Sequence, residues 1–276
     1  MDPRLQRRVQ RYGWDRASDV YDRAWSRQLE PAQSLLLQMA ALRPGENVVE
    51  TACGSGLVTA RIAAAVGKTG SVMATDLSQG MLDRARSAVE RSGEANITFQ
   101  RADAEALDLP EGTFDAALCA LGLMYVPDPG AALREMARVL RPAGRAVVAV
   151  WGERKRCGWA DIFPIVDSRV ETEVCPLFFQ LGTGGTLQAQ MEAAGFGDVR
   201  MRRIETTLEY ESDAEAVDAA FAGGPVAMAY SRFDLDTRNE AHLEYLASIR
   251  PYRTDRGYRI PGEFVVVRGE RLDPEA

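Results

Sequence analysis

The sequence is poor in the residues that build metal and disulfide sites. It has one histidine, His242, and none of its four cysteines stands in a C-x-x-C spacing. Structural and catalytic zinc sites need clusters of such ligands, so we expect no metal site. We expect the cysteines to be reduced, mostly buried thiols: Cys53, Cys119, Cys157 and Cys175.

Long apolar runs and basic clusters are also missing. No segment approaches the roughly 18 consecutive apolar residues of a transmembrane helix, and the first twenty residues are too polar for a signal peptide. The formal net charge is −7, with arginines scattered among acids, which disfavours a nucleic-acid partner. We therefore expect a soluble, cytoplasmic monomer or homodimer without an integral membrane segment.

What is present is an alternation of strand and helix patterns. Helical patterns cover residues 57–66, Ser78–Ser92, with Ser78 as N-cap, and Gly130–Leu140. This alternation is typical of a parallel α/β sheet with helices on both faces. The short β-branched runs that precede or follow these helices are Asn47–Thr51, Ser71–Thr75, Ile97–Arg101, Ala116–Ala120 and Ala146–Trp151.

The two ends of the chain depart from this rhythm. Residues 1–30 suggest one or two short helices, and Pro31 then opens a helix over Ala32–Ala41. Residues 152–186 are irregular, and segments of this length are usually functional or partly helical. The remaining patterns are a helix at Leu187–Ala194, strands at Val199–Tyr210 and Glu263–Arg268, and helices at Asp213–Phe221 and Asn239–Ile249.

The turn after the first strand carries the first functional signal. The run V-V-E-T-A-C-G-S-G at residues 48–56 places Gly54 and Gly56 at the carboxyl end of a parallel sheet, where such sheets bind ligands. A dinucleotide site would have a third glycine where Thr59 stands, and a phosphate loop would have G-K-[ST]. A tight turn without a ligand is the remaining interpretation.

Acidic residues at three successive strand ends favour a ligand. Glu50 precedes the turn and would repel a pyrophosphate but suit a ligand with a nearby cation. Asp76 ends the second strand and can accept hydrogen bonds from two ribose hydroxyls. Asp103 follows the third strand, where a carboxylate can accept from an adenine amine. Each acid alone is more often a helix cap or a solvated loop residue, but three together are not expected by chance.

This set of motifs resembles the class I S-adenosylmethionine-dependent methyltransferases, and especially the branch with the ubiquinone and menaquinone methyltransferases. The resemblance covers about residues 30–151 and leaves 152–262 unassigned. The segments that carry it are V-V-E-T-A-C-G-S-G (48–56), A-T-D-L-S (74–78), R-A-D-A-E-A-L-D-L-P (101–110), F-D-A-A-L-C-A-L-G-L-M-Y-V-P-D (114–128) and L-R-E-M-A-R-V-L-R-P-A-G (133–144).

The resemblance implies a fold, a division of the chain and a cofactor site. It implies a Rossmann-like doubly wound α/β sheet of seven strands, mostly parallel, with the last strand antiparallel. The chain would be a single methyltransferase domain, with an N-terminal helical lid (1–42), a cofactor-binding core (43–151) and substrate-side insertions with the last strands (152–276). It also implies cofactor-binding roles for Tyr21, Glu50, Ala52, Gly54, Gly56, Asp76, Leu77, Met81, Asp103, Ala104, Ala120 and Leu121. One departure is Thr51-Ala52, where many relatives have a glycine, and we expect these small residues to be tolerated.

The implied reaction is methyl transfer from S-adenosylmethionine, with S-adenosylhomocysteine as product. The acceptor can be an oxygen, nitrogen or carbon atom, and a hydroxyl or carbon acceptor also needs a base. The base candidates are Tyr125, His242 and Glu173, with Asp167 near the last of these. His242 would lie on or beside an inner helix face formed by Leu243, Leu246 and Ile249, and each candidate has packing or solvation as its ordinary alternative.

Aromatic and aliphatic residues outside the core motifs point to a small, partly apolar acceptor rather than a macromolecule. One aromatic group lies near the start of the chain and another after the fifth strand, and both are expected to cover the cleft or form outer core. These groups are Tyr12, Trp14, Tyr21 and Trp25, then Trp159, Phe163, Phe178 and Phe179. The further apolar residues expected to line the acceptor site are Ile162, Ile165, Val174 and Leu177.

Two other functions stay open on the sequence. One is an NAD-dependent oxidoreductase, against which Glu50 and Thr59 speak. The other is a module that binds the cofactor without turnover, because binding residues alone do not prove catalysis.

Overall fold

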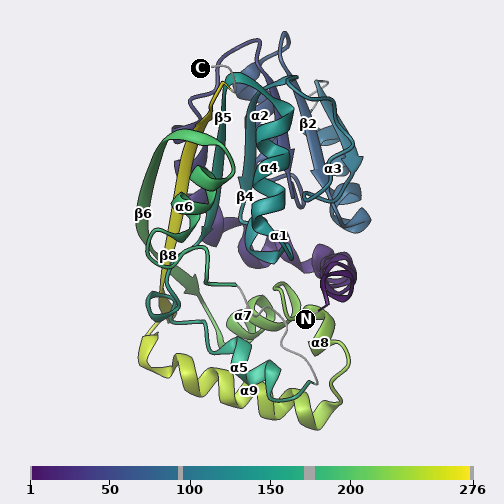
Figure 1. The fold of residues 1–276 in the computed structure, drawn as a ribbon. Helices are drawn as coiled ribbons and strands as arrows, with labels where there is room; N and C mark the ends of the chain where they lie inside the picture. Colours follow the sequence, from purple (N-terminus) through teal and green to yellow (C-terminus); the bar gives the residue numbers. More distant parts are fainter. Residues whose placement is uncertain (1, 93–95, 171–177, 274–276) are drawn as a thin grey trace.

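One mixed β-sheet organises the molecule (Figure 1). The computed structural model describes residues 2–92, 96–170 and 178–273. The sheet order is β3-β2-β1-β4-β5-β8-β6, and β8 runs antiparallel to both β5 and β6. The strands are β1 (Asn47–Thr51), β2 (Ser71–Asp76), β3 (Ile97–Arg101), β4 (Phe114–Ala120), β5 (Leu140–Trp151), β6 (Phe196–Tyr210), β7 (Arg253–Thr254) and β8 (Gly257–Arg271).

The predicted seven-stranded sheet with an antiparallel last strand is confirmed. Strands β1 to β5 pair in parallel, as the strand–helix alternation indicated. The two-residue β7, which pairs with the start of β8, is the one addition to the seven strands within the described residues. Strand β4 is buried along nearly its whole length, because helices cover both faces of the sheet at its centre.

The helices form two groups. Those of the sheet layer are α2 (Thr59–Val66), α3 (Gln79–Ser92), α4 (Pro129–Val139) and α6 (Thr186–Ala193). A second group lies beyond the carboxyl ends of the parallel strands (Figure 1): α5 (Ile162–Asp167), α7 (Asp213–Val217), α8 (Ala227–Tyr230) and α9 (Leu235–Ile249). As predicted, Ser78 caps α3, since its Oγ accepts a hydrogen bond from the Met81 N–H at 3.1 Å.

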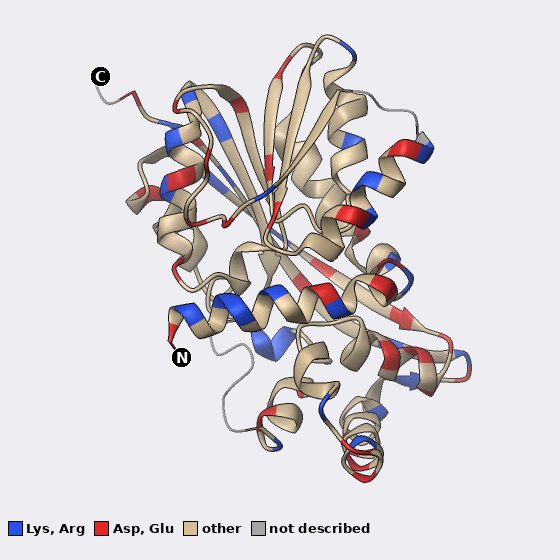
Figure 2. Ribbon diagram, turned by 90° about the vertical axis from the view of Figure 1, so that its right-hand side faces the viewer, with Lys and Arg blue, Asp and Glu red and all other residues tan. Residues whose placement is uncertain are grey.

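Helix α1 (Pro3–Ala40) is one continuous helix, so the prediction of one or two short helices followed by a new helix at Pro31 is wrong. Pro31 removes one internal hydrogen bond, but buried residues on both sides of it, including Leu29, Ala32 and Leu36, hold the helix together. Figure 2 shows α1 running between the sheet and the second helix group. The helix thereby connects both layers and reaches the ends of the strands.

Two further predictions about local structure need correction. Strand β5 begins at Leu140 rather than Ala146, because Leu140 pairs with Phe114 before residues 141–144 bulge out of register. On α9, Leu243 is 70% exposed, and the buried face is formed by Ala241, Tyr245 and Ile249. The helical pattern at 213–221 is also broken, since α7 continues into a π-helical turn at Asp218–Ala222.

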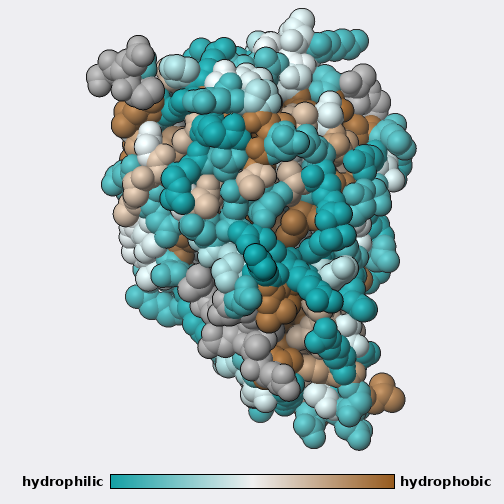
Figure 3. Space-filling model, turned by 45° about the vertical axis from the view of Figure 1, so that its right-hand side comes forward, coloured by the Kyte–Doolittle hydropathy of each residue, from teal (hydrophilic) through white to brown (hydrophobic). Residues whose placement is uncertain are grey.

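Hydrophilic residues predominate on the face of the molecule that Figure 3 shows. Figure 3 shows one face on which apolar atoms are scattered among hydrophilic ones. No helix within the described residues combines the length and hydrophobicity needed to cross a bilayer. The large apolar side chains that are exposed are Leu5 and Tyr12 on α1, Leu235 and Leu243 on α9, and Leu272 after β8.

Candidate functional site

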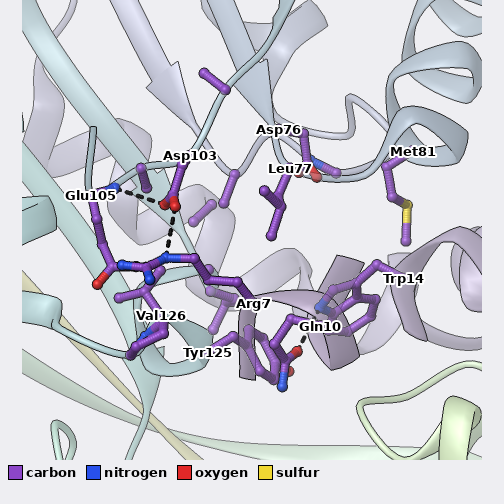
Figure 4. A pocket seen from close by; sticks show the side chains of 18 of the residues that line it. Arg7, Gln10, Trp14, Asp76, Leu77, Met81, Asp103, Glu105, Tyr125 and Val126 are labelled. Atoms are coloured by element: carbon purple, nitrogen blue, oxygen red, sulfur yellow. Dashed lines mark hydrogen bonds and ion pairs between the residues drawn. The ribbon is translucent and has the colours of Figure 1, made fainter. Parts of the chain in front are cut away.

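A pocket opens where β1, β2, β3 and β4 end, and the N-terminal half of α1 closes it from the other side (Figure 4). Ten of the twelve predicted cofactor residues line it, together with Tyr125, whereas Glu50 and Gly56 do not. We call it the strand-end pocket. Its lining residues are Arg7, Gln10, Trp14, Tyr21, Ala52, Gly54, Asp76, Leu77, Met81, Ala102, Asp103, Ala104, Glu105, Ala120, Leu121, Gly122, Tyr125, Val126 and Pro127.

The turn after β1 presents bare backbone to this pocket. Gly54 has a φ of 56°, a left-handed conformation that glycine adopts freely. Ala52 has a φ of 52°, which costs a residue with a Cβ about 1–2 kcal/mol. The Thr51-Ala52 pair thus fits the turn with backbone strain at Ala52. Such strain is common where a backbone is held in a fixed position beside a ligand.

Asp76 lies at the floor of the pocket with both oxygens directed to backbone groups. Oδ2 accepts from the Gly54 N–H and Oδ1 from the Ser78 N–H, each at 2.8 Å. A carboxylate offers about four acceptor positions, so two remain for a ligand. Burial raises the pKa of Asp76 to about 6, although its two backbone hydrogen bonds work in the opposite direction.

Glu50 is buried beneath the turn rather than in the pocket. Its side chain is 1% exposed, and its Oε2 accepts a hydrogen bond from Thr59 Oγ1 at 2.5 Å. Burial raises the pKa of Glu50 to about 8, so the group is largely protonated at neutral pH in the ligand-free protein. The Cβ that Gly56 lacks would meet Ala85 at 3.1 Å, so this glycine serves close packing of the turn against α3.

Glu50→Gln is expected to stabilise the ligand-free protein increasingly as pH rises. The folded state keeps the Glu50 proton until a pKa of about 8, whereas the unfolded chain releases it near the ordinary glutamate pKa of 4.5. Stability is therefore lost between these two values, and the neutral Gln removes that loss. We expect the advantage of Gln to grow by about 2–4 kcal/mol between pH 5 and pH 8.5. Urea unfolding of both proteins at each pH measures it, and parallel pH profiles would contradict a buried, proton-retaining Glu50.

Asp103 is held by a residue of α1. Arg7 Nε lies 2.8 Å from Asp103 Oδ2, and Arg7 Nη2 lies 2.7 Å from Glu105 Oε2 (Figure 4). The other oxygen of Asp103 accepts from the Glu105 N–H at 3.0 Å. The far end of the pocket thus depends on the start of α1, and a ligand amine at Asp103 would lie beside the Arg7 guanidinium.

A second cavity adjoins the strand-end pocket and is lined mainly by rings. Trp14, Tyr21, Leu121 and Tyr125 belong to both cavities. We call the second one the aromatic cavity. The residues that line it are Trp14, Tyr21, Trp25, Leu29, Leu121, Met124, Tyr125, Trp151, Trp159, Phe178, Gly224 and Pro225.

Five of the eight predicted aromatic residues line the aromatic cavity, and three do not. Trp14, Tyr21, Trp25, Trp159 and Phe178 line the aromatic cavity, as expected for residues that cover the cleft. The others do not line it: Phe163 is buried in the core, Phe179 is partly buried, and Tyr12 is 42% exposed. Of the apolar residues expected at the acceptor site, Ile162 and Ile165 are core residues, while Val174 and Leu177 lie outside the described residues.

The base candidates are separated in space. Tyr125 lines both cavities, and its ring contacts Trp14 and Phe178 at centroid distances of 5.0 and 5.4 Å. His242 lines neither; its Nε2 lies 2.9 Å from the Tyr230 hydroxyl, and burial lowers its pKa. Glu173, like Cys175, lies outside the described residues. Tyr125 is thus the one candidate that the described structure places beside the pocket.

Several pocket residues were missed by sequence reasoning. Arg7 and Gln10 share one face of α1 with Trp14, which was expected to cover the cleft, but nothing in the sequence assigned Arg7 or Gln10 to the pocket. Gly122 packs so closely that an added Cβ would lie 2.3 Å from the Ala52 Cβ. The other missed residues are Ala102, Glu105, Val126 and Pro127.

The remaining chemistry of the described residues is limited. The cysteines Cys53, Cys119 and Cys157 are free and buried, as predicted, and burial raises the pKa of each thiol. No group of three or more potential metal-ligating side chains occurs among residues 2–92, 96–170 and 178–273.

Known proteins have sequences similar to part of this chain. Residues 48–144 match a family model described as a methyltransferase domain. The ubiquinone/menaquinone biosynthesis C-methyltransferase UbiE of Shewanella frigidimarina is 40% identical over 113 residues. This alignment covers 41% of the present chain and 45% of that protein, so the chain matches less than half the length of this relative.

Solved structures extend the likeness to most of the fold. A putative methyltransferase from Bacillus halodurans has a TM-score of 0.64 and 20% identity, covering 87% of this chain and 99% of its own. An N-methyltransferase from Haemonchus contortus, bound to phosphomonomethylethanolamine and S-adenosylhomocysteine, has a TM-score of 0.58 and 13% identity. That alignment covers 88% of this chain and 53% of the other.

The sheet order is the one expected of a class I S-adenosylmethionine-dependent methyltransferase, and the family match lies in the part of the chain that forms the strand-end pocket. Residues 48–144 belong to the methyltransferase-domain family, whose typical cofactor is S-adenosylmethionine, and the chain is distantly similar to the small-molecule C-methyltransferase UbiE. The NAD-dependent oxidoreductase left open by the sequence is thereby set aside.

Proposed function

We propose that the chain transfers a methyl group from S-adenosylmethionine to a small, partly apolar acceptor. The observation that carries this proposal is that the strand-end pocket and the aromatic cavity share Trp14, Tyr21, Leu121 and Tyr125. A cofactor in the first cavity would lie directly beside an acceptor in the second. Both the composition of the aromatic cavity and its burial favour an apolar molecule over a macromolecular tail.

The residues of the strand-end pocket fit the parts of this cofactor. Asp76 has acceptor positions free for two ribose hydroxyls, and Asp103 can accept from the adenine amine. Leu77 and Met81 offer apolar surface to the adenine ring, with Ala104 at its edge. The methionine portion would lie against the turn at Ala52–Gly54 and against the residues that end β4, Ala120 and Leu121.

S-adenosylmethionine supplies a methyl group on a positively charged sulfur, which leaves as a neutral thioether. The chain would orient the acceptor and exclude water, and orientation alone can lower a barrier by about 7–11 kcal/mol. Among the described residues of the aromatic cavity, the only ionisable side chains are Tyr21 and Tyr125. Burial raises the pKa of Tyr21 far above its usual value, so Tyr21 stays protonated and is not the base. Tyr125 is the candidate base, and it would have to be a phenolate to take the proton that the acceptor loses.

Calorimetry with S-adenosylhomocysteine tests the cofactor assignment. We expect binding with a stoichiometry of one, and absence of binding at millimolar product would overturn it. Incubation with S-adenosylmethionine and a panel of phenols, quinols and amines then tests transfer by the release of S-adenosylhomocysteine. Tight binding without release for any acceptor would favour a cofactor-binding module without turnover.

We further infer a cytoplasmic location and a small-molecule partner. The three buried, free cysteines are consistent with a reducing compartment. The net charge of −7 disfavours nucleic acid as the methyl acceptor. The proposal includes the division of the chain into a helical lid (1–42), a cofactor-binding core (43–151) and substrate-side segments (152–276).

A further inference from the structure

The aromatic cavity contains two hydrogen-bond donors that have no acceptor. The indole Nε1 atoms of Trp25 and Trp159 are buried and unpaired within the described structure. Both side chains are deeply buried, at 6% and 3% exposure, and both line the cavity. Buried N–H groups nearly always have a hydrogen-bond partner. Two such donors without a partner beside one cavity therefore call for an explanation.

The neighbouring indole of Trp14 shows that unpaired donors are not a general feature of the cavity. Trp14, which lines the same cavity, donates its N–H to Gln10 Oε1 at 3.1 Å. The rings of Trp25 and Trp159 lie 6.0 Å apart and meet edge to face, and each also contacts Trp151. The two unpaired donors thus belong to one cluster of rings that borders the cavity.

A ligand with oxygen acceptors would satisfy both donors. Carbonyl, ether or phenolate oxygens accept from an indole N–H, whereas an ammonium group has no lone pair to offer. Ring faces can attract a cation, but the described lining contains no carboxylate to compensate for the lost solvation of one. The surrounding rings of Trp151, Tyr125 and Phe178 favour a flat apolar body between the polar atoms.

We propose that the aromatic cavity binds a neutral or anionic flat acceptor whose oxygen atoms accept hydrogen bonds from Trp25 and Trp159. This inference rests on the proposed methyl transfer for the role of the ligand, but not for its binding. It selects oxygenated aromatic molecules over amines and hydrocarbons, all of which the apolar composition alone would admit.

Three bicyclic probes of similar size test the selection: coumarin, which has two oxygen acceptors, naphthalene, which has none, and N-methylquinolinium, which is cationic. Binding is measured by calorimetry with and without saturating S-adenosylhomocysteine. We expect coumarin to bind about 10-fold or more tightly than the other two, from two additional hydrogen bonds. Equal or tighter binding of naphthalene or of the cation would overturn the proposal.

Substitutions that keep the ring and remove the N–H locate the effect. Trp25→Phe and Trp159→Phe are each expected to weaken coumarin binding about 3–10-fold and to leave naphthalene binding nearly unchanged. Trp14→Phe is the matched control, because its N–H is already paired with Gln10. An effect of Trp14→Phe equal to that of the other two would assign the loss to ring size rather than to the donors.

A measurement on the unmodified protein covers the case in which a variant does not fold. The chain has four tryptophans, so 15N-labelled indole N–H signals can be followed individually by NMR. Coumarin is expected to move the signals of Trp25 and Trp159 downfield, and naphthalene is not. Unmoved signals in the presence of bound coumarin would contradict the proposal. Failure of the proposed function would show separately, as absent binding of S-adenosylhomocysteine while coumarin still binds.

Discussion

Asp76→Ala is expected to weaken the binding of S-adenosylhomocysteine at least about a hundredfold, because two hydrogen bonds to a charged group are lost at about 1.5–3 kcal/mol each. The substitution also removes the partners of the Gly54 and Ser78 N–H groups, which lie 2.8 Å from the carboxylate oxygens. Calorimetry of wild type and variant gives the affinity ratio, and thermal unfolding reports whether the turn has loosened.

A ligand lacking the ribose hydroxyls separates these two effects. The wild-type protein is expected to bind the 2′,3′-dideoxy analogue of S-adenosylhomocysteine about as weakly as Asp76→Ala binds the natural product. The variant should hardly distinguish the two ligands, since the carboxylate that would do so is gone. Asp83→Ala is the control, because Asp83 is an exposed acid of α3 outside the pocket. If Asp76→Ala still discriminates as strongly as the wild type, the ribose is recognised elsewhere.

Gly122→Ala is expected to destabilise the protein by about 1–3 kcal/mol, the usual range for overpacking, and to disturb the strand-end pocket as well. Gly122 has φ −102° and ψ −34°, which alanine adopts readily, so backbone strain is not the cause. The cause is the contact, since the new Cβ would lie 2.3 Å from the Ala52 Cβ. Displacing Ala52 moves the turn that would hold the methionine portion, and we expect methyl transfer about 10²-fold slower.

The contact can be relieved from its other side. In the double variant Ala52→Gly with Gly122→Ala, the nearest remaining atom is Cys119 Sγ at 3.3 Å, so most stability should return. Ala52→Gly alone should be neutral or mildly stabilising, because glycine suits the φ of 52°. Gly185→Ala is the matched control, since its Cβ would meet nothing within 4 Å. Urea unfolding of the four proteins completes the cycle, and additive effects of the two substitutions would contradict a direct clash.

The strand ends in residues 43–151 could be predicted because each strand and turn is specified by a few neighbouring residues. The β-branched runs and the glycine turn specify β1 and its exit, and β1 and β3 were predicted to the residue. Parallel strands bring their carboxyl ends to one edge, so Asp76, Asp103 and Leu121 could be placed together before any contact was known. Glu50 belongs to the same motif, but its side chain does not line the strand-end pocket and is hydrogen-bonded to Thr59 instead.

The sequence patterns by themselves thus determined the five parallel strands, the glycine turn and the acids Asp76 and Asp103 of the strand-end pocket, since strand periodicity and turn residues act over a few positions. The antiparallel end of the sheet was expected only from the family resemblance. Only the tertiary structure decided how distant segments meet. Helix α1 brings Arg7 to Asp103 and Trp25 to Trp159, pairs that are 96 (103 − 7) and 134 (159 − 25) positions apart in the chain. Which buried donors find partners depends on such long-range packing, and no local pattern encodes it.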